Sequence, residues 1–339
     1  MVKRVAVVLG DPRLRDGVKV GGEFNPEDFQ AIELLKQALA EVPGHQFEYL
    51  DHHATLWADL VFFKQRCDAA GEVGLVMNLC DEGYGNNPFC ELHVPAMLEM
   101  LGLPYTGAGP QAMVICYDKN MVRLLAQAAG VPVPQEVVLR AEDKVGVFAE
   151  ERFPLLVKPN HGDGSQGITV QSVVRNQREL EDYVAKLRRD FPERMVLVQE
   201  FLSGAEYSVC LVGSEAAGFL DLPILQVDYG KLDPALPQIL GYESKWEMDS
   251  AYVRDIIYKP VTDLPLATRD EMLVAAKLMF ARTNCRGYAR FDFRCDSAGR
   301  VKLLEVNPNP GWCWDGKMNV MAGFVGMRYS QLLEAILRG

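Results

Sequence analysis

The fold is decided by the stretch Arg290-Phe-Asp-Phe-Arg-Cys-Asp-Ser-Ala-Gly-Arg-Val-Lys-Leu-Leu-Glu-Val-Asn-Pro-Asn-Pro-Gly311. Its alternation of apolar and polar residues predicts one strand over residues 288–294 and another over residues 301–306. Between them, Asp296-Ser-Ala-Gly299 is a short turn of the kind that joins antiparallel strands. The sequence therefore predicts an antiparallel hairpin, followed by a rigid, irregular segment where a binding loop would be useful.

The side chains of this hairpin are expected to divide into two faces. The apolar face should hold Phe291, Phe293, Leu304 and Val306. The polar face should hold Asp292, Glu305 and Asn307. Two carboxylates and an amide oxygen suit Mg²⁺ or Mn²⁺, which take their remaining ligands from water and nucleotide phosphates. The hairpin thus predicts a divalent metal site, and the alternative is a plain solvated face.

Composition limits the classes of function. The chain has 339 residues, 49% hydrophobic and 24% charged, with a formal net charge of −11. This acidic balance argues against nucleic acid as a partner, and no apolar run is long enough for a signal peptide or a membrane span. We expect a cytoplasmic protein without a membrane partner. Eight scattered cysteines without a C-x-x-C pair predict buried free thiols, and the pair His52-His53 is expected at the surface.

The first part of the chain alternates strands with helices, which predicts a parallel sheet. The strands are expected at 4–9, 47–50 and 73–79, and the helices at 26–41, 55–69 and 91–101. The loop Cys80–Pro88, which includes Asp81 and Glu82, follows the third strand at the edge where open α/β sheets bind ligands. It is a candidate substrate loop, and a plain surface turn is an equal alternative.

A domain boundary is expected before the helix predicted at 118–129. Gly107-Ala-Gly109 is a weak match to a dinucleotide fingerprint, because Pro104 precedes it and Pro110 follows it, so we interpret it as a turn. The chain then divides into three predicted domains. These are 1–109 for an N-terminal α/β domain, 110–199 for a central subdomain and 200–339 for a C-terminal subdomain with the metal site.

Lys158 ends a strand predicted over residues 153–159, and a glycine-rich loop, Asn160–Ile168, leads from it into another expected strand. Backbone N–H groups of such a loop can close over phosphate oxygens while an ammonium neutralises them. The G-x-x-x-x-G-K-[ST] pattern of a P-loop is absent from this segment. A structural hairpin is the alternative, but an unpaired buried lysine is expensive, which favours a phosphate site.

Two further segments are typical of a nucleotide site. The linker Val198-Gln-Glu-Phe-Leu-Ser-Gly204 joins two predicted strands and offers backbone groups to an adenine edge, and Glu206 begins the next strand. Residues 223–265 then form a long stretch without a clear pattern, containing Tyr242-Glu-Ser-Lys-Trp246. A connection of this length is usually a mobile lid or a functional loop.

These segments together resemble the ATP-grasp superfamily and, within it, the branch of the D-alanine:D-alanine ligases. The resemblance covers essentially the whole chain. The motifs that carry it are Asp118-Lys119, Leu156-Val-Lys-Pro159 with its glycine-rich loop, Val198–Glu206, Tyr242-Glu-Ser-Lys245, Gly287–Asp292 and Leu304–Gly311. It implies an α/β ATP-grasp fold, in which two α+β subdomains clamp ATP behind an N-terminal parallel domain.

The resemblance also implies an activity: ATP phosphorylates a carboxylate, and an amine attacks the acyl phosphate to give an amide. The phosphates of ATP would contact Lys119, Lys158, Lys245 and the loop residues Gly164 and Ser165. The adenosine would contact Gln199, Glu200, Leu202 and Glu206. Two Mg²⁺ or Mn²⁺ ions would be held by Asp292, Glu305 and Asn307. The catalytic group would comprise Arg290, the backbone N–H of Gly311, and Lys245 on the lid.

The expected substrate pockets depart from the family. A His-Gly pair in the third-strand loop of the family is replaced here by Asp81 and Glu82, and Glu23 is an uncertain equivalent of the glutamate that binds the first substrate. The remaining departures fall where the family has a serine, a tyrosine and a Ser-Leu pair. These positions are Gly164, Trp246, and Gly316 with Lys317. We therefore expect a ligase with altered pockets.

The predicted substrates are a small carboxylate and an amine, most simply amino acids or peptides. Two alternatives stay open: a true D-alanine:D-alanine ligase, and a non-catalytic ATP-binding regulatory protein on the same fold. Retention of both Lys245 and Arg290 speaks against the second alternative, because nucleotide binding alone requires neither. The family is commonly dimeric, which predicts a homodimer.

Overall fold

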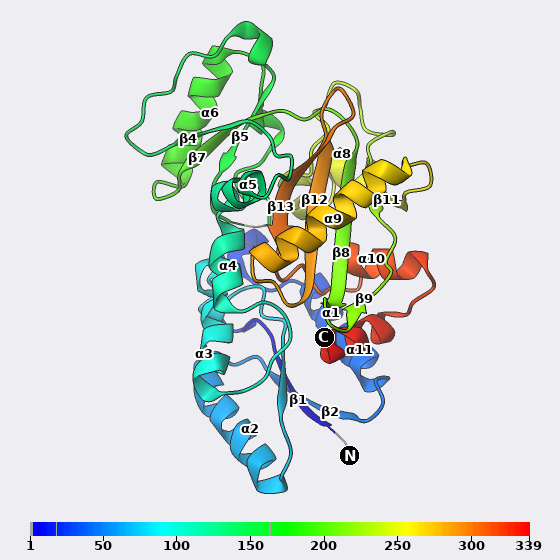
Figure 1. The fold of residues 1–339 in the computed structure, drawn as a ribbon. Helices are drawn as coiled ribbons and strands as arrows, with labels where there is room; N and C mark the ends of the chain where they lie inside the picture. The colour runs from blue at the N-terminus through cyan, green and yellow to red at the C-terminus, as the bar shows by residue number, and fades with distance from the viewer. Residues whose placement is uncertain (1–2, 18, 163) are drawn as a thin grey trace.

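The computed structural model describes residues 3–17, 19–162 and 164–339, whose strands form three sheets in three parts of the molecule (Figure 1). The first sheet is parallel with the order β2-β1-β3. Its strands are β1 Lys3–Val8, β2 His45–Leu50 and β3 Leu75–Asn78. Its helices are α1 Pro26–Ala40, α2 Leu56–Ala70 and α3 His93–Leu101. The parallel N-terminal unit expected from the sequence is confirmed.

The alternation of β1 explains why this sheet is covered on both sides. Val5 and Val7 pack with residues of α1, whereas Ala6 and Val8 pack with residues of α2 and α3. Both sets are fully buried. Such a continuous apolar run is typical of a parallel strand with helices on each face.

The second sheet is antiparallel, with the order β4-β7-β5-β6, and one of its faces is covered by α6. Its elements are β4 Glu136–Leu139, β5 Leu155–Pro159, β6 Val173–Val174, β7 Val196–Glu200 and α6 Gln177–Asp190. The prediction of a strand directly after the glycine-rich loop is wrong. A 3-10 helix, Val170–Ser172, comes first and leaves only the two-residue β6. Asp163 of that loop lies outside the described residues.

The third sheet is antiparallel, with the order β11-β10-β8-β12-β13 and β9 beside β8, and α9 packs on it (Figure 1). Its elements are β8 Glu206–Ser214, β9 Gly218–Phe219, β10 Leu225–Asp228, β11 Ile257–Pro260, β12 Gly287–Cys295, β13 Val301–Asn307 and α9 Leu266–Arg282. The stretch 223–265, which sequence patterns left irregular, contains two of these strands and two short helices. The helices are α7 Glu243–Trp246 and α8 Ala251–Asp255.

Two helices connect the first sheet to the second, and one of them was missed. The turn expected at Gly107–Gly109 is present, but α4 Pro110–Tyr117 begins directly after it, with Gly109 as its N-cap. Proline is well suited to this first helical position. The second helix, α5 Lys119–Ala128, matches the prediction and is capped by the side chain of Asp118, which accepts a hydrogen bond from the Met121 N–H.

The C-terminal helices α10 Lys317–Phe324 and α11 Tyr329–Arg338 return the chain to the N-terminal unit (Figure 1). Leu332, Leu333 and Ile336 of α11 share one apolar core with Val5 and Leu35. Each sheet lies within one of the three expected domains, except that β7 ends one residue beyond the boundary at 199. The division at 109 and 199 therefore stays a proposal.

Candidate functional site

The hairpin of β12 and β13 brings the two expected metal carboxylates together. In its antiparallel register Asp292 lies directly opposite Glu305, and Arg290 lies opposite Asn307. The expectation that the two acidic side chains lie side by side is confirmed.

The apolar face of the hairpin differs from the expectation at one residue. The register shifts after Asp292, so that Phe293 pairs with Leu303. Leu303 is buried in the core with Phe293, whereas Leu304 is only half-buried. The expected placement of Leu304 with the phenylalanines is wrong, because a β-bulge adds one residue to β13 and reverses the alternation.

Asp292 is the centre of a charged cluster and is only 5% exposed. Arg290 donates from Nε to Oδ1 and from Nη2 to Oδ2, both at 3.0 Å. Ser208 Oγ donates to Oδ1 at 2.6 Å, and Lys317 Nζ lies 3.6 Å from the same oxygen. Burial by itself raises the pKa of Asp292, but the positive charges of Arg290 and Lys317 outweigh it and hold the pKa well below its usual value. Asp292 is therefore ionised.

Glu305 and Asn307 complete the polar face. Asn307 Nδ2 donates to Asp292 Oδ2 at 3.2 Å and to Glu305 Oε1 at 3.4 Å. Lys119 Nζ lies 3.9 Å from Glu305 Oε2. Burial would raise the pKa of Glu305, but the charge of Lys119 is the largest of the effects that give a net lowering. Both carboxylates are thus prepared to bind cations.

The two phosphate lysines expected from the sequence lie beside this cluster. Lys158 is the penultimate residue of β5 and is 5% exposed, and Lys119 is the first residue of α5. Lys119 Nζ donates to the carbonyl of Gly162 in the glycine-rich loop. Burial lowers the pKa of Lys158, and the charge of Lys119 lowers it further, while Glu136 and Glu305 raise it. The two ammonium groups therefore lie close enough to repel each other. An anion bound between them would relieve this repulsion.

The linker between the second and third sheets contains the residues expected at the adenine. Gln199 is 3% exposed, and its Nε2 donates to Glu136 Oε2 at 2.8 Å. The carboxylate of Glu200 accepts hydrogen bonds from Lys302 and from the Gln135 N–H. Both contacts fall on Oε1, and the backbone N–H of Glu200 donates to the Gln135 carbonyl at 3.0 Å. Leu202 is also buried, with 4% of its surface exposed.

Glu206, the expected ribose ligand, is held by two buried partners. Tyr229 donates its hydroxyl to Glu206 Oε2 at 2.7 Å, and Arg294 Nη1 donates to the same oxygen at 3.2 Å. A cavity of about 440 Å³ opens beside the linker, lined by Phe201, Ser203 and Arg294 together with residues 234–238. Glu206 does not line this cavity itself, but Arg294, which donates to it, does.

The expected lid is docked on the glycine-rich loop. Trp246 Nε1 donates to the Gly164 carbonyl at 3.0 Å, and Ser165 Oγ donates to the Leu240 carbonyl at 3.0 Å. The two positions that depart from the family, Gly164 and Trp246, therefore contact each other directly. Lys245, which precedes the tryptophan, has an exposed side chain.

The segment after the hairpin contains the residues expected to bind the acceptor. The space beside Gly311 is open, since a Cβ built there meets no atom within 4 Å. Gly316 is the N-cap of α10. Lys317 points inward: its side chain is 11% exposed, and Nζ donates to Ser208 Oγ at 3.1 Å.

The candidate substrate loop meets this segment. Trp312 Nε1 donates to Asp81 Oδ1 at 3.2 Å, and Glu82 forms an ion pair with Lys19 at 3.5 Å. Burial raises the pKa of Asp81 well above its usual value, and the charge of Glu82 raises it further. Glu23 is exposed, and the contacts of the described residues do not bring it into this cluster.

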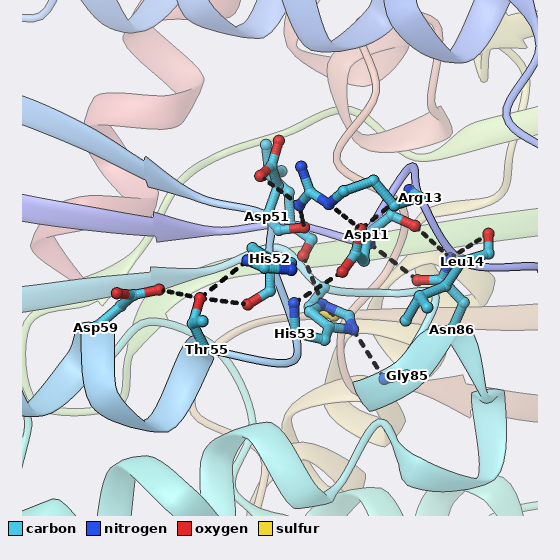
Figure 2. A network of polar contacts seen from close by, with 12 residues as sticks. Asp11, Arg13, Leu14, Asp51, His52, His53, Thr55, Asp59, Gly85 and Asn86 are labelled. Atoms are coloured by element: carbon cyan, nitrogen blue, oxygen red, sulfur yellow. Dashed lines mark hydrogen bonds and ion pairs between the residues drawn. The ribbon is translucent and has the colours of Figure 1, made fainter.

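A buried histidine anchors the substrate loop (Figure 2). His53, expected at the surface, is only 2% exposed. Its Nδ1 accepts the Gly85 N–H at 2.8 Å, its Nε2 lies 2.9 Å from the Leu9 carbonyl, and its backbone N–H donates to Asp11 at 2.8 Å. Asn86 bonds to the backbone N–H and carbonyl of Asp11. The loops after β1, β2 and β3 are thus tied together.

Sequence reasoning missed Ser208, Glu136 and His53. Ser208 lies on β8 directly opposite Asp292, and Glu136 lies on β4 directly opposite Gln199. The available signal for Glu136 was Gln199, because a buried side-chain amide needs hydrogen-bond partners. His53 carried no comparable signal.

Three sheets with charged residues converging between the second and third define an ATP-dependent ligase of the ATP-grasp class. A family model described as the D-ala D-ala ligase C-terminus matches residues 125–338, and the chain belongs to this family. It is similar to the uncharacterized protein y4sG of Sinorhizobium fredii, with 30% identity over 295 residues, covering 87% of this chain and 82% of the relative. It is also similar to the D-alanine–D-alanine ligase of Bordetella pertussis, with 31% identity over 243 residues, 71% of each chain.

Solved structures share the fold over nearly the whole chain. The D-alanine–D-alanine ligase from Bacillus anthracis complexed with ATP superposes with a TM-score of 0.69 at 19% identity, covering 99% of this chain and 96% of that one. The VanG D-Ala:D-Ser ligase from Enterococcus faecalis gives 0.67 at 17% identity, covering 100% and 99%. None of the helices in the described part of the chain is long and apolar enough to cross a membrane.

Proposed function

We propose that this ligase forms an amide bond between a carboxylate and an amine through an acyl phosphate, and that its main product is not D-alanyl-D-alanine. One observation carries the proposal: Asp292 and Glu305 face each other within reach of Arg290, Lys119 and Lys317. Ionised carboxylates surrounded by buried cations are suited to holding a polyphosphate with its metal ions.

The hairpin fits Mg²⁺ or Mn²⁺, two ions in this proposal. Asp292 and Glu305 supply ionised oxygens, and Asn307 bridges them through its amide. The Asn307 side chain would turn to present its oxygen, a change that an amide makes without altering its shape. A bound ion would neutralise charge on the phosphates, and Ser208 and Arg290 would orient Asp292.

The nucleotide would lie between the second and third sheets. Lys119 and Lys158 would bind the α- and β-phosphates with the loop residues Gly164 and Ser165, and Lys245 of the lid would reach the γ-phosphate. Gln199 and the backbone of Glu200 and Leu202 would contact the adenine, and Glu206 the ribose hydroxyls. A cavity lined by Phe201 and Ser203 lies beside the linker that would supply the adenine contacts.

Arg290 and the Gly311 N–H would stabilise the oxyanion that develops during acyl transfer. The open space beside Gly311 leaves room for a reacting group. Arg290 is already aligned by Asp292, so its guanidinium needs little rearrangement when charge develops. This preorganisation is what makes such donors effective.

The substrate pockets support a pair other than two D-alanines. Trp246 bonds to a backbone carbonyl in the glycine-rich loop, and Lys317 lies inside the acceptor region rather than in solvent. We propose an acceptor that is bulkier or more anionic than D-alanine. Lys317 also forms an ion pair with Asp292 at 3.6 Å, which offsets part of its positive charge. Asp81 and Glu82 would line the donor side near Trp312, and Glu23 stays the least supported residue of this set.

A screen of acids against amines tests the proposed function. ADP release would be measured with ATP, Mg²⁺ and pairs of amino acids, dipeptides and other small acids, and products would be identified by mass spectrometry. The proposal expects release only with particular pairs. True D-alanine:D-alanine ligase activity is the alternative, and the cytoplasmic location and the homodimer stay predictions.

A further inference from the structure

Gln199 and Glu136 form a buried, hydrogen-bonded pair that joins two neighbouring strands. The two residues are register partners in β7 and β4, and Gln199 Nε2 donates to Glu136 Oε2 at 2.8 Å. The side chain of Glu136 is 1% exposed. Its second oxygen accepts from Asn120 Nδ2 at 2.9 Å and lies 3.3 Å from Arg123 Nε. Neither oxygen of Glu136 is therefore free to exchange partners.

The chemistry of this pair fixes the orientation of the amide. An ionised carboxylate only accepts hydrogen bonds, so the NH₂ group of Gln199 must face Glu136. Its carbonyl oxygen Oε1 is then the group left for a ligand. Arg123 Nε lies 3.3 Å from Glu136 Oε1, and Lys158 also interacts electrostatically with this carboxylate. The side-chain amide of Gln199, which could donate or accept a hydrogen bond, therefore presents only an acceptor to a ligand.

We infer that Glu136 is a positioning residue for base selection: it makes Gln199 accept from a 6-amino purine and reject a 6-oxo purine. This inference rests on the proposed placement of the adenine beside Gln199. An amino group at position 6 donates to Oε1, whereas a carbonyl at position 6 would meet a second acceptor. Releasing the amide would let Gln199 turn and donate to that carbonyl.

The test is the affinity of the full chain for ATP and for inosine triphosphate, which carries a 6-oxo group, by calorimetry with Mg²⁺ and no amine. The wild-type chain should prefer ATP. In Glu136→Gln both side chains are amides, either of which can turn, and the ratio of the two dissociation constants should narrow by about 10- to 100-fold, the effect of one buried polar group left unpaired. The variant Glu181→Gln, on the exposed surface of α6, should keep the wild-type ratio.

A reciprocal exchange provides the second variant. Glu136→Gln/Gln199→Glu keeps one amide and one carboxylate in the pair, and the carboxylate then stands at the base, so most of the ATP preference should return. This variant carries the test even if Glu136→Gln fails to fold. The inference is overturned, and the proposed function is not, if Glu136→Gln leaves the ratio of the two dissociation constants unchanged or if the exchange variant loses its preference for ATP. A wild-type chain that binds neither nucleotide overturns the proposed function and this inference with it.

Discussion

At the scale of single residues, Glu305 is expected to be essential to turnover and dispensable to folding. Glu305→Gln removes the negative charge opposite Asp292 while preserving shape, so the metal should bind poorly and most activity should be lost. The measurement is ADP release with Mg²⁺ or Mn²⁺ for both proteins, with thermal unfolding as the control for folding. A normal rate in the variant, or full turnover of the wild-type enzyme in EDTA, would contradict the metal assignment.

Two other residues should separate binding from chemistry. Lys158→Ala should weaken ATP binding, because its buried ammonium lies beside Lys119 at the glycine-rich loop. Arg290→Ala should leave ATP binding nearly intact and reduce turnover roughly 10²- to 10³-fold, the usual effect of one oxyanion donor. Titration with ATP and turnover would be measured on both variants. Equal effects on both quantities would reject this division of roles.

How far the site could be predicted depends on how local each contact is. Asp292 and Glu305 belong to one hairpin, so alternation and a short turn were sufficient to place them. The pair of Glu136 and Gln199 joins strands 63 residues apart, and no local pattern reports such a distance. The direction of the Lys317 side chain could not be predicted for a related reason: it depends on Ser208, which is 109 residues away in the chain.

At the scale of elements, His53 should make the N-terminal unit sensitive to acid. Burial lowers the pKa of this imidazole in the folded chain. As the pH falls below about 6.5, the ordinary value, the unfolded chain takes up a proton that the folded chain excludes. The free energy of unfolding should therefore decrease toward the lowered pKa, and a proton on Nδ1 would break the bond from the Gly85 N–H.

The measurement is the melting temperature of wild type and His53→Gln between pH 7.5 and pH 5, a range chosen to bracket the ordinary pKa of histidine. The variant should be less stable at neutral pH by about 1–3 kcal/mol, because the Gly85 N–H loses its acceptor. It should also lose part of the decline toward acid. The exposed His52 offers the matched control, His52→Gln. If the wild-type and His53→Gln curves run parallel, His53 does not cause the pH dependence.

Elements were predicted well where periodicity was long and poorly where a tertiary contact overrode it. The helix α1 follows from repeating apolar residues. The bulge at Leu304 does not, because it depends on how β13 fits against β12. Likewise, β10 and β11 lie in a segment that seemed irregular, since strands of only four residues carry little pattern of their own.

At the scale of the whole molecule, D-alanine alone should be a poor substrate pair. The lid meets the glycine-rich loop through Trp246 and Gly164, and Lys317 occupies the acceptor side. Unmatched polar groups in a site built for hydrogen bonds can reduce a rate constant by about 10⁴-fold. The assay is ADP release with ATP, Mg²⁺ and D-alanine, with the product identified by mass spectrometry. Abundant D-alanyl-D-alanine at millimolar D-alanine would contradict this prediction and would identify the chain as a D-alanine:D-alanine ligase.

The packing of α11 against the first sheet has a consequence for synthesis on the ribosome. Val5 and Leu35 leave the exit tunnel roughly 300 residues before Leu332 and Ile336, which complete their core. At about 5–20 residues per second, one side of the N-terminal sheet stays uncovered for on the order of tens of seconds. During that interval the nascent chain presents an apolar surface to its surroundings, so chaperones that bind such surfaces have a natural point of engagement there.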